Sequence, residues 1–187
     1  MTSDDATNDG ELVRRARAGD EVAYGALVKR YMRAAYVVAL SVTRRPEDAE
    51  DAAQESFLVA LERLDECRSP EKFGGWFMTI VRNRSRNLVR REALRATDPV
   101  PEAAHSAGPT PDVSVVRSEL REHLQGALSQ LTEVQRQIVL LHDMEGFKHR
   151  EIAELLGLPS GTVRSHLHFA RRELRSALGE VMEIGRE

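Results

Sequence analysis

A proline-rich segment near the middle of the chain sets the strongest limit on its fold. Four of the seven prolines lie between Pro99 and Pro111, with few large apolar side chains around them. Such a stretch cannot bury enough apolar surface to offset the entropy that it loses on ordering, so it is predicted to be a linker. The predicted divisions of the chain are a disordered N-terminus (1–10), a front domain (11–96), a linker (97–118), a back domain (119–180) and a C-terminal tail (181–187).

The net charge of −3 conceals a strong segregation of charge within the front half. Residues 11–97 carry 17 basic and 13 acidic groups, and these groups are clustered by sign. Five acids and no base lie between Glu47 and Glu55, whereas six arginines and a single acid lie between Arg82 and Arg95. The local field, rather than the net charge, decides whether a surface attracts a polyanion. A nucleic-acid partner is therefore compatible with this acidic chain.

Cysteine content, the N-terminus and the longest apolar runs exclude several protein classes. The single cysteine, Cys67, rules out an internal disulfide framework, and no cluster of cysteine and histidine has zinc-site spacing. The acidic N-terminus is unlike a signal peptide, and apolar runs such as residues 36–40 are far shorter than a membrane span. No phosphate-binding loop, nucleophile elbow or metal-ligand set is present. We expect a cytoplasmic protein without membrane insertion, enzymatic activity, metal or cofactor.

Apolar residues that recur every three or four positions predict three long helices in the front domain, over residues 21–43, 46–64 and 72–95. The expected buried side of the second helix comprises Ala49, Ala52, Ala53, Phe57, Ala60, Leu61 and Leu64. The third helix carries Phe73, Trp76, Phe77, Ile80 and Val81, which we assign mainly to the core. A composition rich in Ala, Arg, Leu and Glu agrees with these patterns, and together they predict an all-α fold of two small helical domains.

One face of the second predicted helix is acidic. Asp48, Asp51, Glu55 and Glu62 share that face, and Gln54 borders it. A solvated surface is the usual interpretation of such a pattern, and the pattern alone favours it. The alternative is a docking ridge for a basic partner protein.

The third predicted helix continues as an arginine-rich segment. Arg82, Arg86 and Arg90 lie four residues apart on one side, with Asn83 and Asn87 beside them. Like charges at this spacing repel one another unless a partner offsets them. DNA phosphates would be such a partner, and asparagine amides can bond to base edges. We favour nucleic-acid binding slightly over a solvated basic helix that pairs with the acidic one.

The back domain contains the strongest local pattern in the sequence, which is a helix, a tight turn and a second helix. The two helical segments read HREIAELL and GTVRSHLHFARRELRSAL. Gly157 suits the left-handed conformation that ends a helix, and Ser160 suits the N-cap of the next one. Upstream, Thr132 and Gln135 have the form of a capping box. The pattern predicts a DNA-binding helix-turn-helix in preference to an ordinary helical hairpin with a solvated basic face.

Two sides of the last helix are predicted to have different roles. The buried stripe comprises Val163, Leu167, Ala170, Leu174 and Leu178. The outward side carries Arg164, Ser165, His168, Arg171, Arg172 and Arg175. Arginine can pair with guanine and serine is a tolerant base contact, whereas Arg171 and Arg172, one turn later, suit phosphates. Because the back domain is net acidic, we expect its DNA affinity alone to be weak.

The two halves together resemble a bacterial RNA polymerase sigma factor of the extracytoplasmic-function (ECF) class of the sigma-70 family. The motifs that carry the resemblance are DAEDAAQESFLVALERL (48–64), FGGWFMTIVRNRSRNLVRRE (73–92), LTEVQRQIVLLHDMEG (131–146) and HREIAELLGLPSGTVRSHLHFARREL (149–174). Their order and spacing are highly specific, and the resemblance covers about residues 11–95 and 119–180. It implies that the front domain is a sigma region 2 helical bundle and the back domain a sigma region 4 helix-turn-helix, joined by a flexible linker.

The resemblance also implies which residues bind each partner. The residues implied for the clamp helices of the polymerase β′ subunit are Asp48, Asp51, Gln54 and Glu55. Those implied for the melted −10 element are Cys67, Arg68, Lys72, Arg82, Asn83, Arg86, Asn87 and Arg90. Those implied for the −35 duplex are Thr162, Arg164, Ser165, His168, Phe169, Arg171 and Arg172. The chain departs from the family at Cys67, where an aromatic is common, at Asn87, where an aspartate is common, and at His166 and Phe169, where arginine is common.

The function that the resemblance implies is promoter-specific transcription initiation with core RNA polymerase, which would be held through its β′ clamp helices and β flap. An anti-sigma factor is implied as a further partner. Two alternatives stay open: a stand-alone helix-turn-helix regulator, which would not explain the acidic face, and a nonspecific nucleic-acid-binding protein. Before polymerase is bound, a flexible linker allows either a closed pair of domains or two independent bodies.

Overall fold

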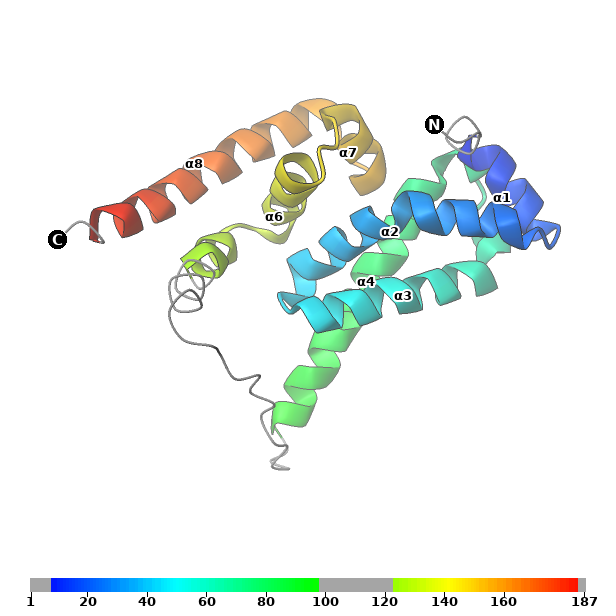
Figure 1. Cartoon of the computed structure of the whole chain (residues 1–187), viewed down its shortest axis with the longest axis horizontal. Helices are drawn as coiled ribbons and strands as arrows, with labels where there is room; N and C mark the ends of the chain where they lie inside the picture. Colours follow the sequence, from blue (N-terminus) through cyan, green and yellow to red (C-terminus); the bar gives the residue numbers. More distant parts are fainter. Residues whose placement is uncertain (1–7, 98–122, 185–187) are drawn as a thin grey trace, which may run out of the picture.

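The computed structural model of the protein describes residues 8–97 and 123–184, and all regular elements in these residues are helices (Figure 1). The front domain contains α1 (Asp9–Arg17), α2 (Glu21–Thr43), α3 (Pro46–Glu62), the 3-10 turns η2 (Leu64–Glu66) and η3 (Pro70–Lys72), and α4 (Phe73–Thr97). The back domain contains a helix over residues 123–130, α6 (Glu133–Val139), the π-helical turn η4 (Leu140–Met144), α7 (His149–Leu156) and α8 (Ser160–Ile184). The predicted all-α fold of two helical domains is confirmed. Residues 98–118 of the predicted linker lie outside the described residues.

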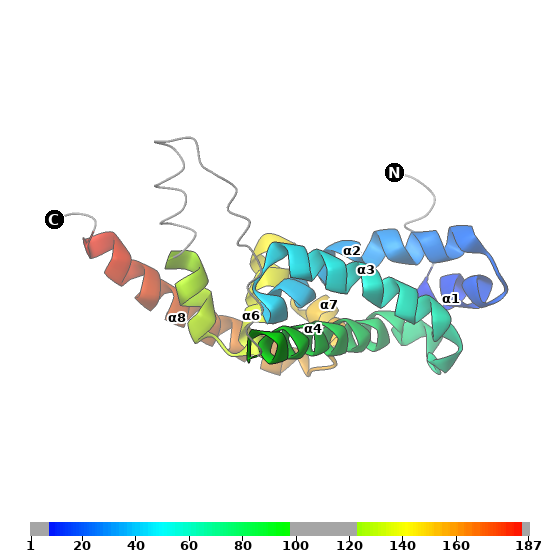
Figure 2. The same cartoon turned by 90° about the horizontal axis from the view of Figure 1, so that it is seen from below.

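The core of the front domain lies where α2, α3 and α4 pack side by side (Figure 2). Three phenylalanines fill it, with ring centroids 4.3 Å apart for Phe57 and Phe77 and 5.6 Å apart for Phe73 and Phe77. Trp76 packs against this cluster and is partly buried, in agreement with its assignment to the core. The aromatic stripe of α4 therefore fixes how the arginine-rich half of the same helix is presented.

The helix boundaries agree closely with the sequence pattern, apart from two corrections in α3. The preceding helix, α2, covers its predicted range, and the Asp20 carboxylate caps it by accepting the Ala23 N–H at 3.0 Å. α3 starts at Pro46 as predicted but ends at Glu62, two residues early, because the chain continues as a 3-10 turn. Leu61, predicted to be buried, is 47% exposed, since the buried stripe of α3 passes through the preceding residue.

The N-terminal helix α1 is not predicted by the sequence pattern. Asp9 and Gly10, expected in a disordered tail, both belong to α1, and Gly10 is buried. The Asn8 side chain caps the helix by accepting a first-turn N–H at 2.9 Å. Asp9 accepts a hydrogen bond from the Tyr31 hydroxyl and pairs with Arg30 at 2.6 Å, and both partners lie on α2. These contacts attach α1 to the bundle. The first seven residues of the predicted tail lie outside the described residues.

The back domain has the predicted helix-turn-helix. Thr132 and Gln135 form the capping box at the start of α6, and Gly157 ends α7 with φ of 66°. Ser160 is the first helical residue of α8 rather than its N-cap, and α8 continues to Ile184, past the predicted start of the C-terminal tail. An unexpected element is η4, a π-helical turn that follows α6 directly.

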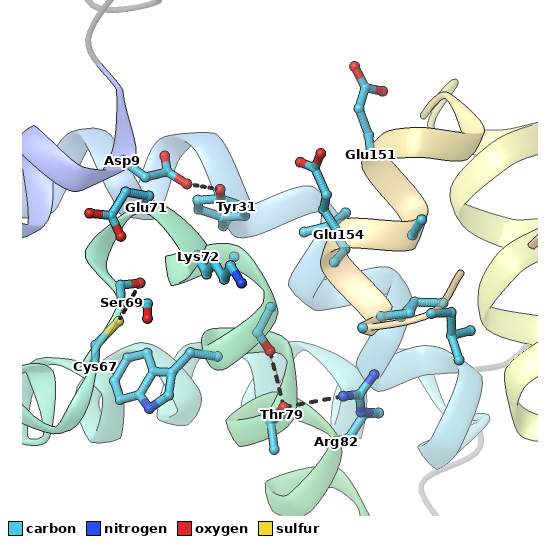
Figure 3. Close-up of a pocket in the computed structure, with 18 of the residues that line it drawn as sticks. Asp9, Tyr31, Cys67, Ser69, Glu71, Lys72, Thr79, Arg82, Glu151 and Glu154 are labelled. Atoms are coloured by element: carbon cyan, nitrogen blue, oxygen red, sulfur yellow. Dashed lines mark hydrogen bonds between the residues drawn. The ribbon is translucent and has the colours of Figure 1, made fainter. Parts of the chain in front are cut away.

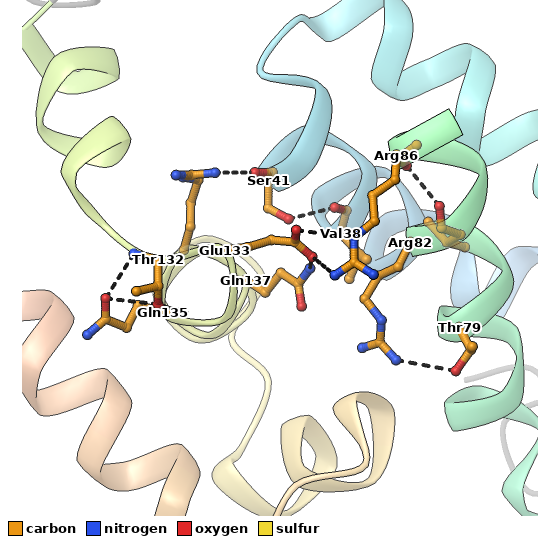
Figure 4. Close-up of polar contacts among 12 residues, drawn as sticks. Val38, Ser41, Thr79, Arg82, Arg86, Thr132, Glu133, Gln135 and Gln137 are labelled. Carbon is orange, nitrogen blue, oxygen red and sulfur yellow. Dashed lines mark hydrogen bonds and ion pairs between the residues drawn. The ribbon is translucent and has the colours of Figure 1, made fainter. Parts of the chain in front are cut away.

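The two domains pack against each other, so the structure shows the closed pair rather than two independent bodies. Arg136 of α6 is 5% exposed, and its guanidinium donates to the carbonyl oxygens of Leu128 and Leu131, at 2.8 Å in each case. The same guanidinium donates to the carbonyl oxygen of Ser41 in α2 (Figure 4). One buried cation therefore bonds to both domains.

A second contact between the domains brings α4 and α7 close together. A Cβ atom on Gly75 would lie 2.9 Å from the backbone oxygen of Glu154, so the approach of the two helices requires glycine at this position. Arg33 of α2 also pairs with Glu145, at 2.6 Å. Glycine in the first turn of a helix costs stability, and here the close packing of α7 offsets that cost.

We expect Arg136→Ala to lower the free energy of unfolding by about 2–4 kcal/mol, because three carbonyl oxygens lose a charged donor. Arg136→Lys should recover only part of the loss, since one ammonium group cannot reproduce the planar fork of a guanidinium. Urea unfolding followed by circular dichroism measures the difference. Arg150→Ala, at an exposed position of α7, is the control and should change the free energy by less than about 0.5 kcal/mol. Equal losses for the two alanine variants would contradict the bridging role.

Candidate functional surfaces

The acidic face of α3 is open to solvent. Asp51, Gln54 and Glu55 are exposed, and we call these three residues the acidic ridge. Glu55 pairs with Arg84 of α4, whereas Asp51 has no ion-pair partner within residues 8–97 and 123–184. Asp48, predicted with them, is only 16% exposed and lies 3.4 Å from the arginine that precedes α3, so it stands apart from the ridge. The ridge offers negative charge that a basic protein surface can complement.

Two leucines continue this surface along α3. Leu58 is 65% exposed and Leu61 is 47% exposed, and both lie on the side of the helix that carries the acidic ridge. Neither belongs to a predicted surface, because the helical pattern predicts Leu61 to be buried and places Leu58 in no surface set. An apolar patch beside charged residues is a common composition for a protein interface. The surface is therefore both acidic and apolar.

The residues predicted for the melted −10 strand lie on α4 and on the loop before it. In the loop and η3, Arg68 and Lys72 are exposed. On α4, the exposed residues are Asn83, Arg86, Asn87 and Arg90, and Arg82 is partly buried. We call these positions on α4 and on the segment before it the basic strip.

Cys67 is the buried member of the predicted −10 set. Its side chain is buried, with Sγ 3.6 Å from the Ser69 carbonyl oxygen, and burial raises the pKa of its thiol. The Cys67 carbonyl oxygen accepts a hydrogen bond from Arg17 Nη2 at 2.5 Å. Residue 67 therefore holds the loop against α1 through its backbone, and its assignment to the −10 set stays a prediction.

A groove of about 1210 Å³ lies between the loop before α4 and helix α7 (Figure 3). The predicted −10 residues that line it are Cys67, Arg68, Lys72 and Arg82, and Trp76 lies among them. The opposite wall carries Glu151 and Glu154 of α7. Asn83, Asn87 and Arg90 lie farther along α4 and do not line the groove. The closed pair thus gathers one part of the predicted −10 set in the groove and leaves the other part outside it.

Some arginines of α4 already have partners within the chain. Arg86 Nη2 lies 2.9 Å from the Glu133 carboxylate of α6 (Figure 4). Arg82 donates to the Thr79 hydroxyl at 3.3 Å, and burial lowers the pKa of its guanidinium. The alternative in which the basic helix pairs with the acidic one is represented by Arg84 and Glu55, and Arg84 is not in the predicted DNA-binding set. Glu133 comes from the other domain, so its contact with α4 follows only from the tertiary fold.

The outer side of α8 has the predicted composition. Arg164, Ser165 and His168 are exposed, Thr162 is partly buried, and Val163, Leu167 and Ala170 fill the buried side. The Ser165 hydroxyl donates to the Gly161 carbonyl oxygen at 3.1 Å, which leaves its lone pairs available as acceptors. Phe169 is 45% exposed, and the Arg172 guanidinium lies 5.3 Å from its ring centroid. The side chains that face solvent could reach base edges and phosphates of a duplex.

The predicted phosphate contact Arg171 is held by an acid from η4. Its Nε lies 3.1 Å from Asp143 Oδ2, and its Nη2 also donates to the same carboxylate. His142 Nδ1 lies 2.9 Å from the Asp143 carboxylate. The hydrogen bond from Arg171, with that from His142, holds the pKa of Asp143 below its ordinary value. Asp143 was in no predicted set, because only the π-helical turn brings it to α8.

The described residues contain neither a candidate metal site nor a candidate membrane-spanning helix. In residues 8–97 and 123–184, no group of three or more histidine, cysteine or acidic side chains is placed to bind a metal ion. In the same residues, no helix has both the length and the apolar character that crossing a membrane requires.

Comparison with known proteins accounts for both domains. The model described as Sigma-70 region 2 matches residues 27–95, and the model described as Sigma-70, region 4 matches residues 121–174. The ECF RNA polymerase sigma factor SigM of Mycobacterium tuberculosis is 31% identical over 172 residues, which cover 92% of this chain and 85% of SigM. The chain belongs to the sigma-70 family of RNA polymerase sigma factors. Its relatives place it in the ECF class of that family.

Further similar proteins include a longer sigma factor and a sigma factor of known structure. The probable RNA polymerase sigma factor RfaY of Xanthomonas campestris pv. campestris is 33% identical over 168 residues, but the chain spans only 42% of its length. Among solved structures, the sigma factor RpoE of Bartonella quintana in complex with the anti-sigma factor NepR has a TM-score of 0.57 at 23% identity. That comparison covers 83% of this chain and 96% of the other, and it supports the fold.

We expect Arg171→Ala to raise the carboxyl pKa of Asp143 toward its ordinary value, because the variant loses the hydrogen bonds that stabilise the carboxylate. In the unsubstituted protein the ion pair should persist below the usual carboxyl range and be lost only as the pH falls through the lowered pKa of Asp143. Carboxyl-detected NMR titration measures that pKa. Arg172→Ala is the matched control, since Arg172 pairs with Glu173 instead, and it should leave the Asp143 titration in place. An unmoved pKa in Arg171→Ala would show that the pair does not form in solution.

Proposed function

We propose that this sigma factor binds core RNA polymerase and directs it to a subset of promoters, without contributing a catalytic group of its own. The observation that carries the proposal is the presence on one chain of three separate exposed surfaces: the acidic ridge of α3, the basic strip of α4 and the outer side of α8. Each has the chemistry that one partner needs, namely a basic protein, a single strand and a duplex. A stand-alone helix-turn-helix regulator would use only the last of these surfaces.

The proposed −10 site would act on unpaired DNA. Arg68 and Lys72 would hold the backbone of the strand, while Asn83 and Asn87 would bond to base edges. Unpairing a base costs free energy, which contacts to the unstacked base must offset. The partly buried indole of Trp76, in the groove wall beside Lys72, is an aromatic surface near the path of such a strand.

The proposed −35 site would act on duplex DNA. The N-terminal half of α8 would lie in the major groove, with Arg164, Ser165 and His168 toward the bases. Arg171 and Arg172 would hold phosphates one turn later. Because Arg171 pairs with Asp143, a phosphate must replace an existing carboxylate there.

The closed pair of domains would open when both DNA sites are used. Glu133 of α6 forms an ion pair with Arg86 of α4, so a bound DNA strand and α6 would compete for the same guanidinium. Polymerase would supply the free energy of opening by holding the two domains apart at a fixed distance. Two weak DNA sites then act together through a high effective concentration, although neither binds strongly alone.

We further propose regulation by a protein inhibitor of the anti-sigma type. The support is the likeness of the fold to RpoE, which was solved in complex with the anti-sigma factor NepR. In this chain, the groove between the domains offers such a partner side chains of both signs, including Lys72 and Arg82 on one wall and Glu154 on the other. Its proposed partners, polymerase and promoter DNA, would require a cytoplasmic location.

Promoter-specific transcription by purified core polymerase tests the proposal. The templates are a library of genomic fragments, with and without the full chain added. We expect transcripts from defined start sites only when the chain is present, each preceded by a shared pair of upstream elements. If no fragment yields a chain-dependent transcript, the proposal fails. Tight binding of duplex DNA by the chain without polymerase would favour the stand-alone regulator instead.

We expect Asp51→Arg to weaken binding to core polymerase by at least about tenfold, because reversing the charge of the acidic ridge opposes a basic partner. Asp51 is a better target than Glu55, since reversing Glu55 would also disturb its ion pair with Arg84. Co-elution on size-exclusion chromatography measures binding, and circular dichroism checks the helical fold. Glu21→Arg, at an exposed acid of α2, is the control and should bind normally. Normal binding by Asp51→Arg would mean that the ridge is only a solvated face.

A further inference from the structure

An exposed phenylalanine interrupts the polar outer side of α8. Phe169 is 45% exposed, and it lies four residues after Ser165 and three residues before Arg172. The ring does not belong to the core, whose places on α8 are filled by Leu167 and Ala170. A phenyl ring that is almost half exposed keeps apolar surface in contact with water, and contact with an apolar group of a partner would remove that surface from water.

Two neighbours on α8 keep the ring in place. The Arg172 guanidinium lies 5.3 Å from the ring centroid, a distance at which a cation is attracted to the face of an aromatic ring. The His168 ring approaches at 5.8 Å between centroids and an interplanar angle of 71°. With both neighbours in contact, almost half of the residue's surface stays accessible. The phenyl group is thus presented on the helix surface in a restrained position.

The major groove of DNA carries one prominent apolar group, which is the C5-methyl of thymine, and a phenylalanine side chain can contact it. A helix-turn-helix places the first half of its second helix against base edges, and phosphate contacts follow along the same helix. Phe169 lies between Ser165, on the base-contacting part, and Arg172, which suits a phosphate. The ring has no donor or acceptor, so it can distinguish bases only through an apolar contact.

We propose that Phe169 reads the methyl group of one thymine in the duplex element and so gives this sigma factor a thymine preference at that position. The proposal rests on the proposed function, in which α8 enters the major groove. Arg172 would then do two things: it restrains the ring, and it directs its charge to a neighbouring phosphate.

Deoxyuridine substitution tests the proposal, because uracil differs from thymine only by the absent methyl group. The full chain and core polymerase are given a promoter found in the fragment library, with each thymine of the upstream duplex element replaced in turn. At one position, uracil should lower the yield of transcript by about fourfold, the ratio expected for one buried methyl group. Phe169→Ala should give equal yields with thymine and uracil at that position.

Two further variants control for effects of folding. Phe169→Leu keeps an apolar side chain and should retain part of the preference for thymine, even if Phe169→Ala weakens transcription on every template. Met144→Ala removes another exposed apolar side chain of the same domain, which is 61% exposed but lies outside α8, and it should keep the full fourfold ratio.

The outcomes separate this proposal from the proposed function. If unmodified promoters are transcribed but uracil has no effect at any position, or has the same effect in Phe169→Ala, then Phe169 does not read a thymine and the sigma function stands. If the chain yields no transcript on unmodified templates, the sigma function fails and this proposal fails with it. A position where uracil lowers transcription in the unsubstituted protein and in Met144→Ala, but not in Phe169→Ala, supports the proposal.

Discussion

The buried guanidinium of Arg136 determines how the two halves of this sigma factor are related. Removing a cation from water is costly, so a buried arginine needs good hydrogen bonds in return. Two of the carbonyl oxygens that accept from Arg136 belong to its own domain, and the third, that of Ser41, belongs to the other. When the domains separate, the guanidinium keeps its hydrogen bonds to Leu128 and Leu131, and the N–H group that donated to Ser41 donates to water instead. The closed pair can therefore open without unfolding the back domain.

The periodicity of the sequence was sufficient to predict the long helices, because each buries a stripe of apolar residues over several turns. The capping box at Thr132 and the left-handed Gly157 were predictable for the same local reason, since both depend on residues that are close in sequence. The helix α1 was not predicted because it is short and its apolar periodicity covers few turns. It is held in place by contacts of Asp9 with Tyr31 and Arg30 of α2, which are distant in sequence. The π-helical turn after α6 has no sequence signature of its own, and its position became clear only in the folded domain.

Most predicted surface residues are exposed, with Asp48 as an exception, and Leu61 is exposed although it was predicted to be buried, whereas the contacts of these residues were not predicted. Asp51 and Ser165 are exposed as their helical positions require. Cys67 lies in a loop, where no periodicity distinguishes inward from outward, and its burial was not foreseen. Glu133 and Asp143 reach Arg86 and Arg171 from other elements, and contacts between residues that are distant in sequence follow only from the tertiary fold.

These two ion pairs bear on how weakly each proposed DNA site would act alone. A guanidinium that already holds a carboxylate gains less from a phosphate than a free one, because one anion replaces another in a similar environment. If α4 and α8 bind DNA as proposed, the pairs of Arg86 and Arg171 would reduce the affinity of the isolated chain for DNA in general. Asn83 and Ser165, which would read bases, carry no such charge. Binding would then depend on sequence and on the polymerase that holds both sites at the correct separation, rather than on basic charge alone.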